Sequence, residues 1–152
     1  MNKIKGVTLI ELLITLAIIS IISSIALPKT NIVCKYKEKA ELREFKNDIV
    51  YARNMAICKS KKYFVRINFK ENYYLIYTIG KVTKEYIKKK ELNSGLTFKR
   101  PLDNSEKVEI SFNSTGAPSG ACTIYLVSRY GDIYSVAITP ATGRINVYLN
   151  RE

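Results

Sequence analysis

An unbroken apolar run occupies residues 7–27, near the start of the chain. About 20 apolar residues are enough to cross the hydrocarbon core of a bilayer. An ordinary secretory signal has a shorter apolar region that ends in a small-residue cleavage site, and no such site closes this run. Lys3 and Lys5 precede the run, and basic residues beside a membrane span stay on the cytoplasmic side. The pattern predicts a transmembrane helix over residues 7–27, behind a polar leader of residues 1–6.

From Pro28 onward the apolar residues recur in steps of three and four. Polar and charged residues fill the positions between them, which is typical of an amphipathic helix with one face toward a core. We expect the helix to continue to about Cys58, with a kink at Pro28, because proline inside a helix bends its axis. The second half of this helix is expected to cover a sheet. Its apolar positions are Leu42, Phe45, Ile49, Ala52 and Ala56.

The remainder of the chain alternates between apolar and polar residues with a period of two, as half-buried strands do. Turn residues separate the alternating segments, and the short connections imply antiparallel pairing. The predicted fold class is α+β: a long N-terminal helix packed on antiparallel β-sheet, arranged as two small sheets. Residues 28–152 form the globular domain. The expected strands are residues 63–69, 73–79, 86–90, 96–99, 108–112, 122–127, 133–138 and 145–149.

Glu11 is the one ionisable side chain within residues 7–27. A charge at such a depth costs at least ~2.5 kcal/mol, so an ionisable residue there is a candidate functional site. A simple membrane anchor would explain the length of the run and the lysines before it, but not this carboxylate. Because the run itself supplies no cation, we expect a positive charge from outside it to meet Glu11.

The residues around Glu11 resemble the prepilin leader of the type IV filament superfamily, which comprises type IV pilins, competence pilins and the pseudopilins of type II secretion. Residues 5–13 are KGVTLIELL, with glycine before the cut and glutamate fifth in the mature chain. The resemblance implies cleavage between Gly6 and Val7 by prepilin peptidase, and N-methylation of the new Val7 amine. It also implies that Glu11 of one subunit meets the Val7 amine of the next. Many members begin the mature chain with phenylalanine, where this chain has valine.

Three segments of the globular domain carry a second resemblance, to H-type minor pseudopilins of type II secretion and FimT/FimU-type minor pilins. Residues 51–56 match an AR-x-x-A helix, residues 110–116 match I-x-F-x-x-x-G, and residues 142–147 match a closing Gly-Arg strand. This resemblance implies a minor subunit at or near the tip of a type IV pilus or a type II secretion pseudopilus. The implied partners are other pilin or pseudopilin subunits, prepilin peptidase and the inner-membrane assembly platform.

The implied localisation follows from the same family. The precursor would be a single-pass protein of the cytoplasmic membrane with its C-terminal domain outside, and the mature chain would enter an extracellular or envelope-spanning filament. Two alternatives stay open. One is a competence-type minor pilin that takes up DNA through its basic surface, and the other is a membrane-anchored surface protein that never polymerises.

The chain is strongly basic, with 25 Lys and Arg against 13 Asp and Glu and a formal charge of +12. Such a balance favours anionic partners such as acidic proteins, cell-wall polymers, nucleic acid or lipid headgroups, but a lysine-rich solvated surface is the favoured explanation. A nucleic-acid binder would combine charge with exposed aromatics, and Tyr86 is the only aromatic residue near the main lysine cluster. Nucleic acid is therefore not the favoured partner. The candidate contacts to an anionic partner are Lys88, Lys89, Lys90 and Arg144.

Catalysis is not expected of this sequence. It has no histidine, which removes the usual general base and the commonest zinc ligand. It also lacks a Gly-rich phosphate loop and a Cys-x-x-Cys pair. Asp103 and Glu106 lie close together in a predicted loop, where a solvated turn explains them better than a metal site. We therefore expect no cofactor and no metal.

The three cysteines, Cys34, Cys58 and Cys122, are an odd number, so at least one is unpaired within the chain. Cys34 and Cys58 fall on the same predicted helix, about 36 Å apart at 1.5 Å per residue, and cannot bridge each other. A disulfide between Cys58 and Cys122 stays open. Otherwise we expect all three to be thiols that are buried as small apolar residues.

Overall fold

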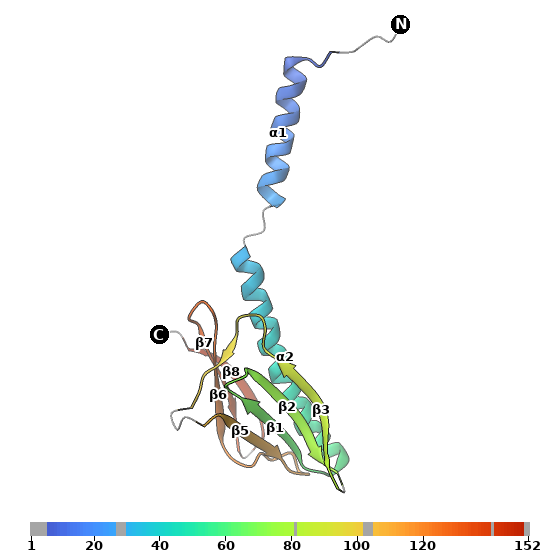
Figure 1. The fold of residues 1–152 in the computed structure, drawn as a ribbon, viewed down its shortest axis with the longest axis vertical. Helices are drawn as coiled ribbons and strands as arrows, with labels where there is room; N and C mark the ends of the chain where they lie inside the picture. Colours follow the sequence, from blue (N-terminus) through green and yellow to red (C-terminus); the bar gives the residue numbers. More distant parts are fainter. Residues whose placement is uncertain (1–5, 27–29, 81, 102–104, 141, 151–152) are drawn as a thin grey trace. The chain divides into compact units, whose positions relative to one another are not determined.

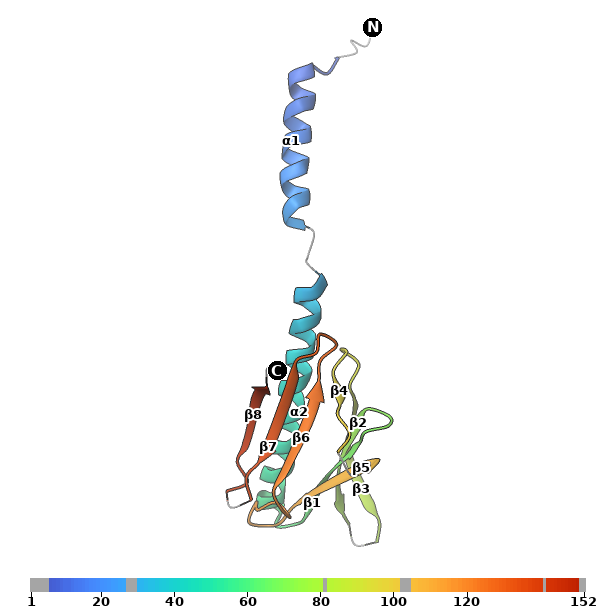
Figure 2. The ribbon, with the colours of Figure 1, turned by 90° about the vertical axis from the view of Figure 1, so that its left-hand side faces the viewer.

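The structure is a computed structural model that describes residues 6–26, 30–80, 82–101, 105–140 and 142–150. The chain divides into two compact units, Met1–Lys35 and Tyr36–Glu152, and each is described by itself. Within the described residues, two helices are followed by eight strands (Figures 1 and 2). The elements are α1 Leu9–Ala26, α2 Thr30–Lys59, β1 Tyr63–Asn68, β2 Tyr73–Ile79, β3 Lys84–Glu91, β4 Thr97–Phe98, β5 Lys107–Phe112, β6 Cys122–Val127, β7 Ile133–Ile138 and β8 Ile145–Asn150.

The helix predicted to run to Cys58 corresponds to α1 and α2. Residues 27–29 lie outside the described residues, so the kink predicted at Pro28 stays a prediction. The end of α2 is within one residue of the predicted position. There Ser60 adopts a φ of 49°, and the Lys61 amide donates to the Ala56 carbonyl at 3.3 Å. This left-handed residue closes the last turn and directs the chain into β1.

Two antiparallel sheets of four strands each confirm the predicted α+β fold. The first sheet has the order β3-β2-β1-β5 and the second has the order β4-β6-β7-β8. In the first sheet Val65 lies opposite Ile76 on one side and Ile110 on the other, so apolar residues form a continuous row across three strands. The predicted strand 96–99 shortens to β4, although the Lys99 amide still donates to the Tyr125 carbonyl at 2.8 Å. The predicted strand 86–90 extends to Lys84–Glu91.

The core lies between α2 and the two sheets. All five predicted apolar positions of α2 are at most 6% exposed, and Ala52 and Ala56 are completely buried. The Phe45 ring packs edge-to-face on Tyr74 of the first sheet at 4.9 Å and on Phe98 of the second at 5.2 Å, which joins the three layers. Every buried core residue falls between Leu42 and Ile145. The core thus draws on no residue of the first unit, so we expect the second unit to fold without the first.

Asn72 links the two sheets through its side-chain amide. The turn predicted at residues 70–72 forms between β1 and β2, with Asn72 at a φ of 52°. Its Nδ2 donates to the carbonyls of Leu92 at 3.1 Å and Leu96 at 3.0 Å, and its Oδ1 accepts from the Phe98 amide at 3.0 Å. One side chain thus satisfies three backbone groups where the chain crosses from the first sheet to the second.

No disulfide joins the cysteines, so the open Cys58–Cys122 pairing is not formed. Cys122 is half-buried and packs against the core, and burial raises the pKa of its thiol. The expectation that all three cysteines are buried is wrong: Cys58 is exposed near the end of α2, and Cys34 is only half-buried. Cys58 lies one residue before the end of α2, and the spacing of three and four residues that the core positions follow does not include it.

Candidate functional site

The segment around the predicted cleavage site is exposed. Gly6 and Val7 precede α1, and the Val7 residue is 70% exposed. A Cβ atom built on Gly6 would meet no other atom within 4 Å. The chain's own packing therefore does not require glycine at this position, and any such requirement comes from a molecule that recognises the segment.

Glu11 lies in the first turn of α1, where an acidic side chain is favoured by the helix dipole. Thr8 caps the helix, because its Oγ1 accepts a hydrogen bond from the Glu11 backbone amide at 3.4 Å. The spacing Thr-x-x-Glu is that of a capping box. The ion pairs found among the described residues all lie in the second unit, so none of them supplies a cation to Glu11. Its assembly role stays a prediction.

Large apolar side chains lie on every side of α1. From Leu9 to Ile22, its large apolar side chains are each between 52% and 78% exposed. A helix that is apolar all round is normally buried, so this one requires an environment that the chain does not provide. Within the described part of the chain, neither helix reaches the combined length and hydropathy of a membrane span.

Arg53 of α2 joins the three segments that carry the second resemblance. Its Nε donates to the Gly116 carbonyl at 3.1 Å, and its Nη2 donates to the Thr142 carbonyl at 2.9 Å. One guanidinium therefore holds the loop after β5 and the turn between β7 and β8 against the helix. Arginine suits this position because its planar fork presents several donors in fixed directions. We call Arg53, Gly116, Thr142 and Gly143 the Arg53 junction.

Both glycines of the Arg53 junction are required by its close packing. Gly116 has a φ of 80°, and a Cβ atom there would lie 2.6 Å from Ile57 Cδ1. Gly143 has a φ of 61°, and a Cβ atom there would lie 2.6 Å from the Gly116 carbonyl oxygen and 2.7 Å from Arg53 Nε. The AR-x-x-A and glycine motifs are thus parts of one contact, which their separation in sequence concealed.

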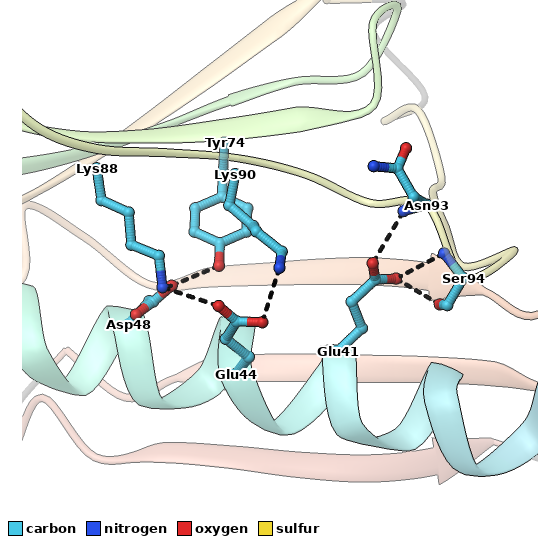
Figure 3. A network of polar contacts seen from close by, with 8 residues as sticks. All are labelled: Glu41, Glu44, Asp48, Tyr74, Lys88, Lys90, Asn93 and Ser94. Atoms are coloured by element: carbon cyan, nitrogen blue, oxygen red, sulfur yellow. Dashed lines mark hydrogen bonds and ion pairs between the residues drawn. The ribbon is translucent and has the colours of Figure 1, made fainter.

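An acidic stripe on α2 docks the helix onto the first sheet and the loop that follows it (Figure 3). Lys88 of β3 reaches Asp48 at 2.7 Å and Glu44 at 2.9 Å, and Lys90 reaches Glu44 at 3.1 Å. Further along the stripe, Glu41 accepts hydrogen bonds from the Asn93 and Ser94 amides and from the Ser94 hydroxyl. The hydroxyl of Tyr74, a residue of β2, also donates a hydrogen bond to Asp48. The acids of the stripe are Glu38, Glu41, Glu44 and Asp48.

Glu38 is the most buried member of the acidic stripe, at 1% exposure. Its Oε2 accepts a hydrogen bond from the Ser128 hydroxyl at 2.5 Å, and Arg129 Nε lies 3.4 Å from its Oε1. The side chain thus anchors α2 to the turn between β6 and β7. In the sequence, charged residues fill the positions between the apolar ones of this helix, and no role was predicted for the acids among them. Their spacing of three and four residues was the signal that they share one side.

The basic residues predicted to contact an anionic partner lie on different faces of the second unit. Lys88 and Lys90 point toward α2 and are ion-paired there (Figure 3). Lys89 is on the opposite face of β3, 2.9 Å from Glu91 and 4.6 Å from the centre of the Tyr73 ring. Arg144 is exposed in the turn before β8. The structure does not bring these four residues together into one patch.

On the outer face of the first sheet, the aromatic and charged side chains contact one another. The Tyr77 ring stacks on Phe64 at 5.0 Å, and Arg66 and Lys84 lie 5.2 and 5.0 Å from its centre. Arg66 also pairs with Glu109 at 2.6 Å. Burial, with the hydrogen bond to Glu109, raises the pKa of Tyr77 to about 12. Because its ring is covered, Tyr77 offers no free stacking surface to a nucleobase.

The stability of the second unit at acidic pH should depend on Glu44 and Glu109. Hydrogen bonds from Lys88 and Lys90 hold the pKa of Glu44 below its usual range. Burial opposes ionisation of Glu109, but hydrogen bonds from Tyr77 and Arg66 outweigh it and lower that pKa too. Both groups therefore stabilise the fold at neutral pH, and this stability is lost as the pH falls below about 5, because the unfolded chain then binds more protons.

The measurement is the urea midpoint of the Tyr36–Glu152 fragment as a function of pH. Replacing both acids with glutamine should make the urea midpoint fall less steeply as the pH is lowered. At pH 7 the same replacement should lower the free energy of unfolding by only about 0.2–1 kcal/mol per ion pair. Glu71→Gln, which replaces an exposed glutamate outside these ion pairs, is the matched control. An unchanged acid profile in the double variant would show that other carboxylates control it.

Within the described residues, no group of three or more His, Cys, Asp or Glu side chains is placed to hold a metal ion. Asp103 lies outside the described residues, so its pairing with Glu106 is not described.

Comparison with known proteins gives one sequence match and two structural ones. Residues 1–27 match the family described as the prokaryotic N-terminal methylation motif. No curated protein matches the sequence. The fold is similar to that of the minor pseudopilin EpsH from the type 2 secretion system of Vibrio cholerae, with a TM-score of 0.59 and 12% identity over 74% of this chain and 96% of that one.

The fold is also similar to that of the type IV minor pilin FimU of Pseudomonas aeruginosa, strain PAO1. The TM-score is 0.57, with 16% identity over 72% of this chain and 91% of that one. The motif implies a membrane-anchored precursor, and it precedes a domain that has the fold of both proteins. The chain thus combines a prokaryotic N-terminal methylation motif with a fold that is similar to those of a minor pseudopilin and a minor pilin.

Proposed function

We propose that this protein is a structural, non-catalytic minor subunit at or near the tip of a type IV pilus or a type II secretion pseudopilus. Prepilin peptidase cleaves the precursor between Gly6 and Val7, and the Val7 amine is then methylated. Before assembly the chain is held in the cytoplasmic membrane with its second unit outside. The assembly platform then inserts it into a filament that is extracellular or spans the envelope.

The observation that carries this proposal is the N-terminal methylation motif joined to an uncovered apolar helix. The motif covers residues 1–27, and the apolar side chains of α1 are exposed on every side. Packing against the same helix of other subunits would bury these side chains, at about 25 cal/mol per Å² of apolar surface. A head-to-tail contact of this kind does not close into a ring and so generates a filament.

The minor rather than major assignment rests on the second unit. Its fold is similar to those of a minor pseudopilin and a minor pilin, and no disulfide closes its C-terminal part. Because one of these proteins belongs to a type 2 secretion system and the other is a type IV minor pilin, the proposal covers both kinds of filament. DNA uptake is less well supported, since Lys88 and Lys90 are ion-paired within the domain.

Purified filaments provide the direct test. Quantitative mass spectrometry should find the chain at a small fraction of the major subunit, beginning at a methylated Val7. A chain that is absent from filaments but abundant in the membrane would support the non-polymerising anchor instead. A chain as abundant as the bulk subunit would contradict the minor assignment while leaving the filament role intact.

Glu11→Val should lower incorporation into filaments by at least about tenfold. The variant removes the counter-charge for the neighbour's Val7 amine, and breaking a buried charge pair is strongly destabilising. The helix cap should survive, because Thr8 Oγ1 accepts from the backbone amide of residue 11, which valine keeps. Membrane insertion should be unchanged or better. Incorporation is measured by quantitative mass spectrometry of sheared filaments.

The matched control is Ser20→Ala, which also removes a polar side chain from α1. The Ser20 hydroxyl donates to the Ala17 carbonyl at 2.8 Å within the helix, so its loss should leave incorporation unchanged. If Glu11→Val enters filaments as efficiently as Ser20→Ala, Glu11 has no assembly role, and its place in the capping box is sufficient explanation.

A further inference from the structure

At one end of the second unit β2 passes into β3, beside the end of α2 (Figure 1). Apolar side chains are exposed there. Val82 is 92% exposed, Tyr86 64% and Ile79 56%. Single exposed apolar residues are common on proteins, but here three lie on one short hairpin. The Gly80 amide donates to the Thr83 carbonyl at 2.9 Å, which closes the hairpin and holds Val82 at its turn.

The strand register places Ile79 and Tyr86 on the face of the first sheet that is turned away from α2. Ile79 lies opposite Lys84 and Tyr77 lies opposite Tyr86 in the pairing of β2 with β3. Thr78, one residue before Ile79, is buried on the α2 side, so its partner Glu85 also falls on that side. Ile79, Tyr86 and Lys84 therefore share one surface. The Glu85 carboxylate lies on the other face, beside Gly80, with its Oε1 2.7 Å from the place where a Cβ atom of Gly80 would be.

Lysines surround the apolar side chains. Lys61 and Lys62 line a shallow hollow together with Ile79 and Gly80. The Thr78 hydroxyl donates to the Lys62 carbonyl at 2.7 Å, which holds this part of the chain beside the end of β2. Lys61, Lys62 and Lys84 are all exposed. We call this surface the hairpin tip; it consists of Lys61, Lys62, Ile79, Val82, Lys84 and Tyr86.

The size and chemistry of the hairpin tip select one class of anionic partner. A stable protein interface buries about 800 Å² on each side, which three apolar side chains do not supply. Nucleic acid binding relies on successive bases stacking on several aromatic rings, and the hairpin tip offers one exposed ring, Tyr86, beside Tyr77, whose ring is covered by Phe64 and two cations. A lipid surface accepts a few apolar side chains at its boundary, together with tyrosine at the headgroups and lysines against anionic lipid.

We propose that the hairpin tip binds the surface of an anionic lipid bilayer. Ile79 and Val82 enter the boundary between headgroups and acyl chains, Tyr86 lies among the headgroups, and the lysines contact lipid phosphates. This binding is separate from the anchorage implied by the N-terminal motif, and it does not depend on the proposed filament role.

The test uses the Tyr36–Glu152 fragment, which has its own core and lacks the apolar α1 helix that would associate with any bilayer. Sedimentation with vesicles should show binding to phosphatidylcholine mixed with phosphatidylglycerol, and little binding to phosphatidylcholine alone. Lys61→Glu/Lys62→Glu should lower the partition coefficient by at least about tenfold, since each lysine near an anionic surface contributes roughly a fivefold change. Lys70→Glu/Lys107→Glu, which changes the net charge equally at exposed sites away from the hairpin tip, is the matched control.

Insertion is tested by fluorescence, because the chain contains no tryptophan. The emission of Val82→Trp should shift to shorter wavelength on mixed vesicles, whereas Tyr148→Trp, at an exposed position of β8, should not shift. Equal loss of binding in both charge-reversal pairs, or no emission shift at residue 82, would overturn the proposal. Tighter binding to duplex or single-stranded DNA than to mixed vesicles would also overturn it. Circular dichroism of each variant checks that it is folded.

Discussion

A Gly6→Val precursor should remain uncut and begin at Met1, whereas the wild-type chain should begin at Val7. The expected cause lies outside the folded chain. A Cβ atom at residue 6 would meet nothing within 4 Å, so valine can be accommodated by the protein itself. If cleavage is lost, the cause is therefore a steric clash in the peptidase, where the branched valine side chain blocks access to the bond between residues 6 and 7. Intact-mass measurement of the protein from membranes and from filaments distinguishes the two forms.

Gly6→Ala is the control for this experiment and should still be cut, because one methyl group is the smallest possible addition. The uncut valine variant should be absent from filaments, since Val7 then has no free amine to meet the Glu11 of a neighbour. Wild-type protein that still begins at Met1 in native filaments would contradict the processing hypothesis. Efficient cleavage of Gly6→Val would show that the glycine is not what the peptidase recognises.

Gly143→Ala should destabilise the second unit by about 2.5–5 kcal/mol. An L-residue in the left-handed region costs roughly 1–2 kcal/mol, and Gly143 has a φ of 61°. The added Cβ would also lie 2.6 Å from the Gly116 carbonyl oxygen and 2.7 Å from Arg53 Nε, the two atoms of one hydrogen bond. Breaking a hydrogen bond to a charged group adds about 1.5–3 kcal/mol. Urea unfolding of the Tyr36–Glu152 fragment measures the change.

Gly131→Ala separates the backbone effect from the contact effect. Gly131 also has a positive φ, of 87°, but a Cβ atom there would meet nothing within 4 Å. This control should therefore cost only the roughly 1–2 kcal/mol of the backbone conformation. Arg53→Lys should be destabilising too, because one ammonium group lacks the fork that reaches both carbonyls. Equal costs for the two glycine variants would show that the Arg53 junction contributes nothing beyond its turn geometry.

Local periodicity in the sequence was enough to predict most of the fold. Leu42, Phe45 and Ile49 were identified as core positions from steps of three and four, and the structure buries each of them. Helix and strand periods arise from backbone geometry, which acts over a few residues, so this information lies within each segment. The leader around Gly6 and Glu11 is local in the same sense, and residues 1–27 match the N-terminal methylation motif by sequence alone.

The partners of the charged side chains were decided only by the tertiary structure. Lys88 and Lys90 were indistinguishable in sequence from Lys89, yet the alternation of β3 directs them toward Glu44 while Lys89 faces the other way. The partners in the Lys88–Glu44 bond are 44 residues apart in the sequence. Which face of β3 meets α2 depends on how the sheet packs as a whole, and composition contains no such information.

The Arg53 junction shows the same division between sequence and structure. Each of its segments was recognised separately in the sequence, but their common contact was not. Arg53 and Thr142 are separated by 89 residues, and their hydrogen bond joins α2 to a turn of the second sheet. Sequence determined which residues can donate, accept or turn with a positive φ. The packing of α2 against both sheets determined that these groups meet, because hydrogen bonds and ion pairs act over a few ångströms and form only where the chain has already been brought together.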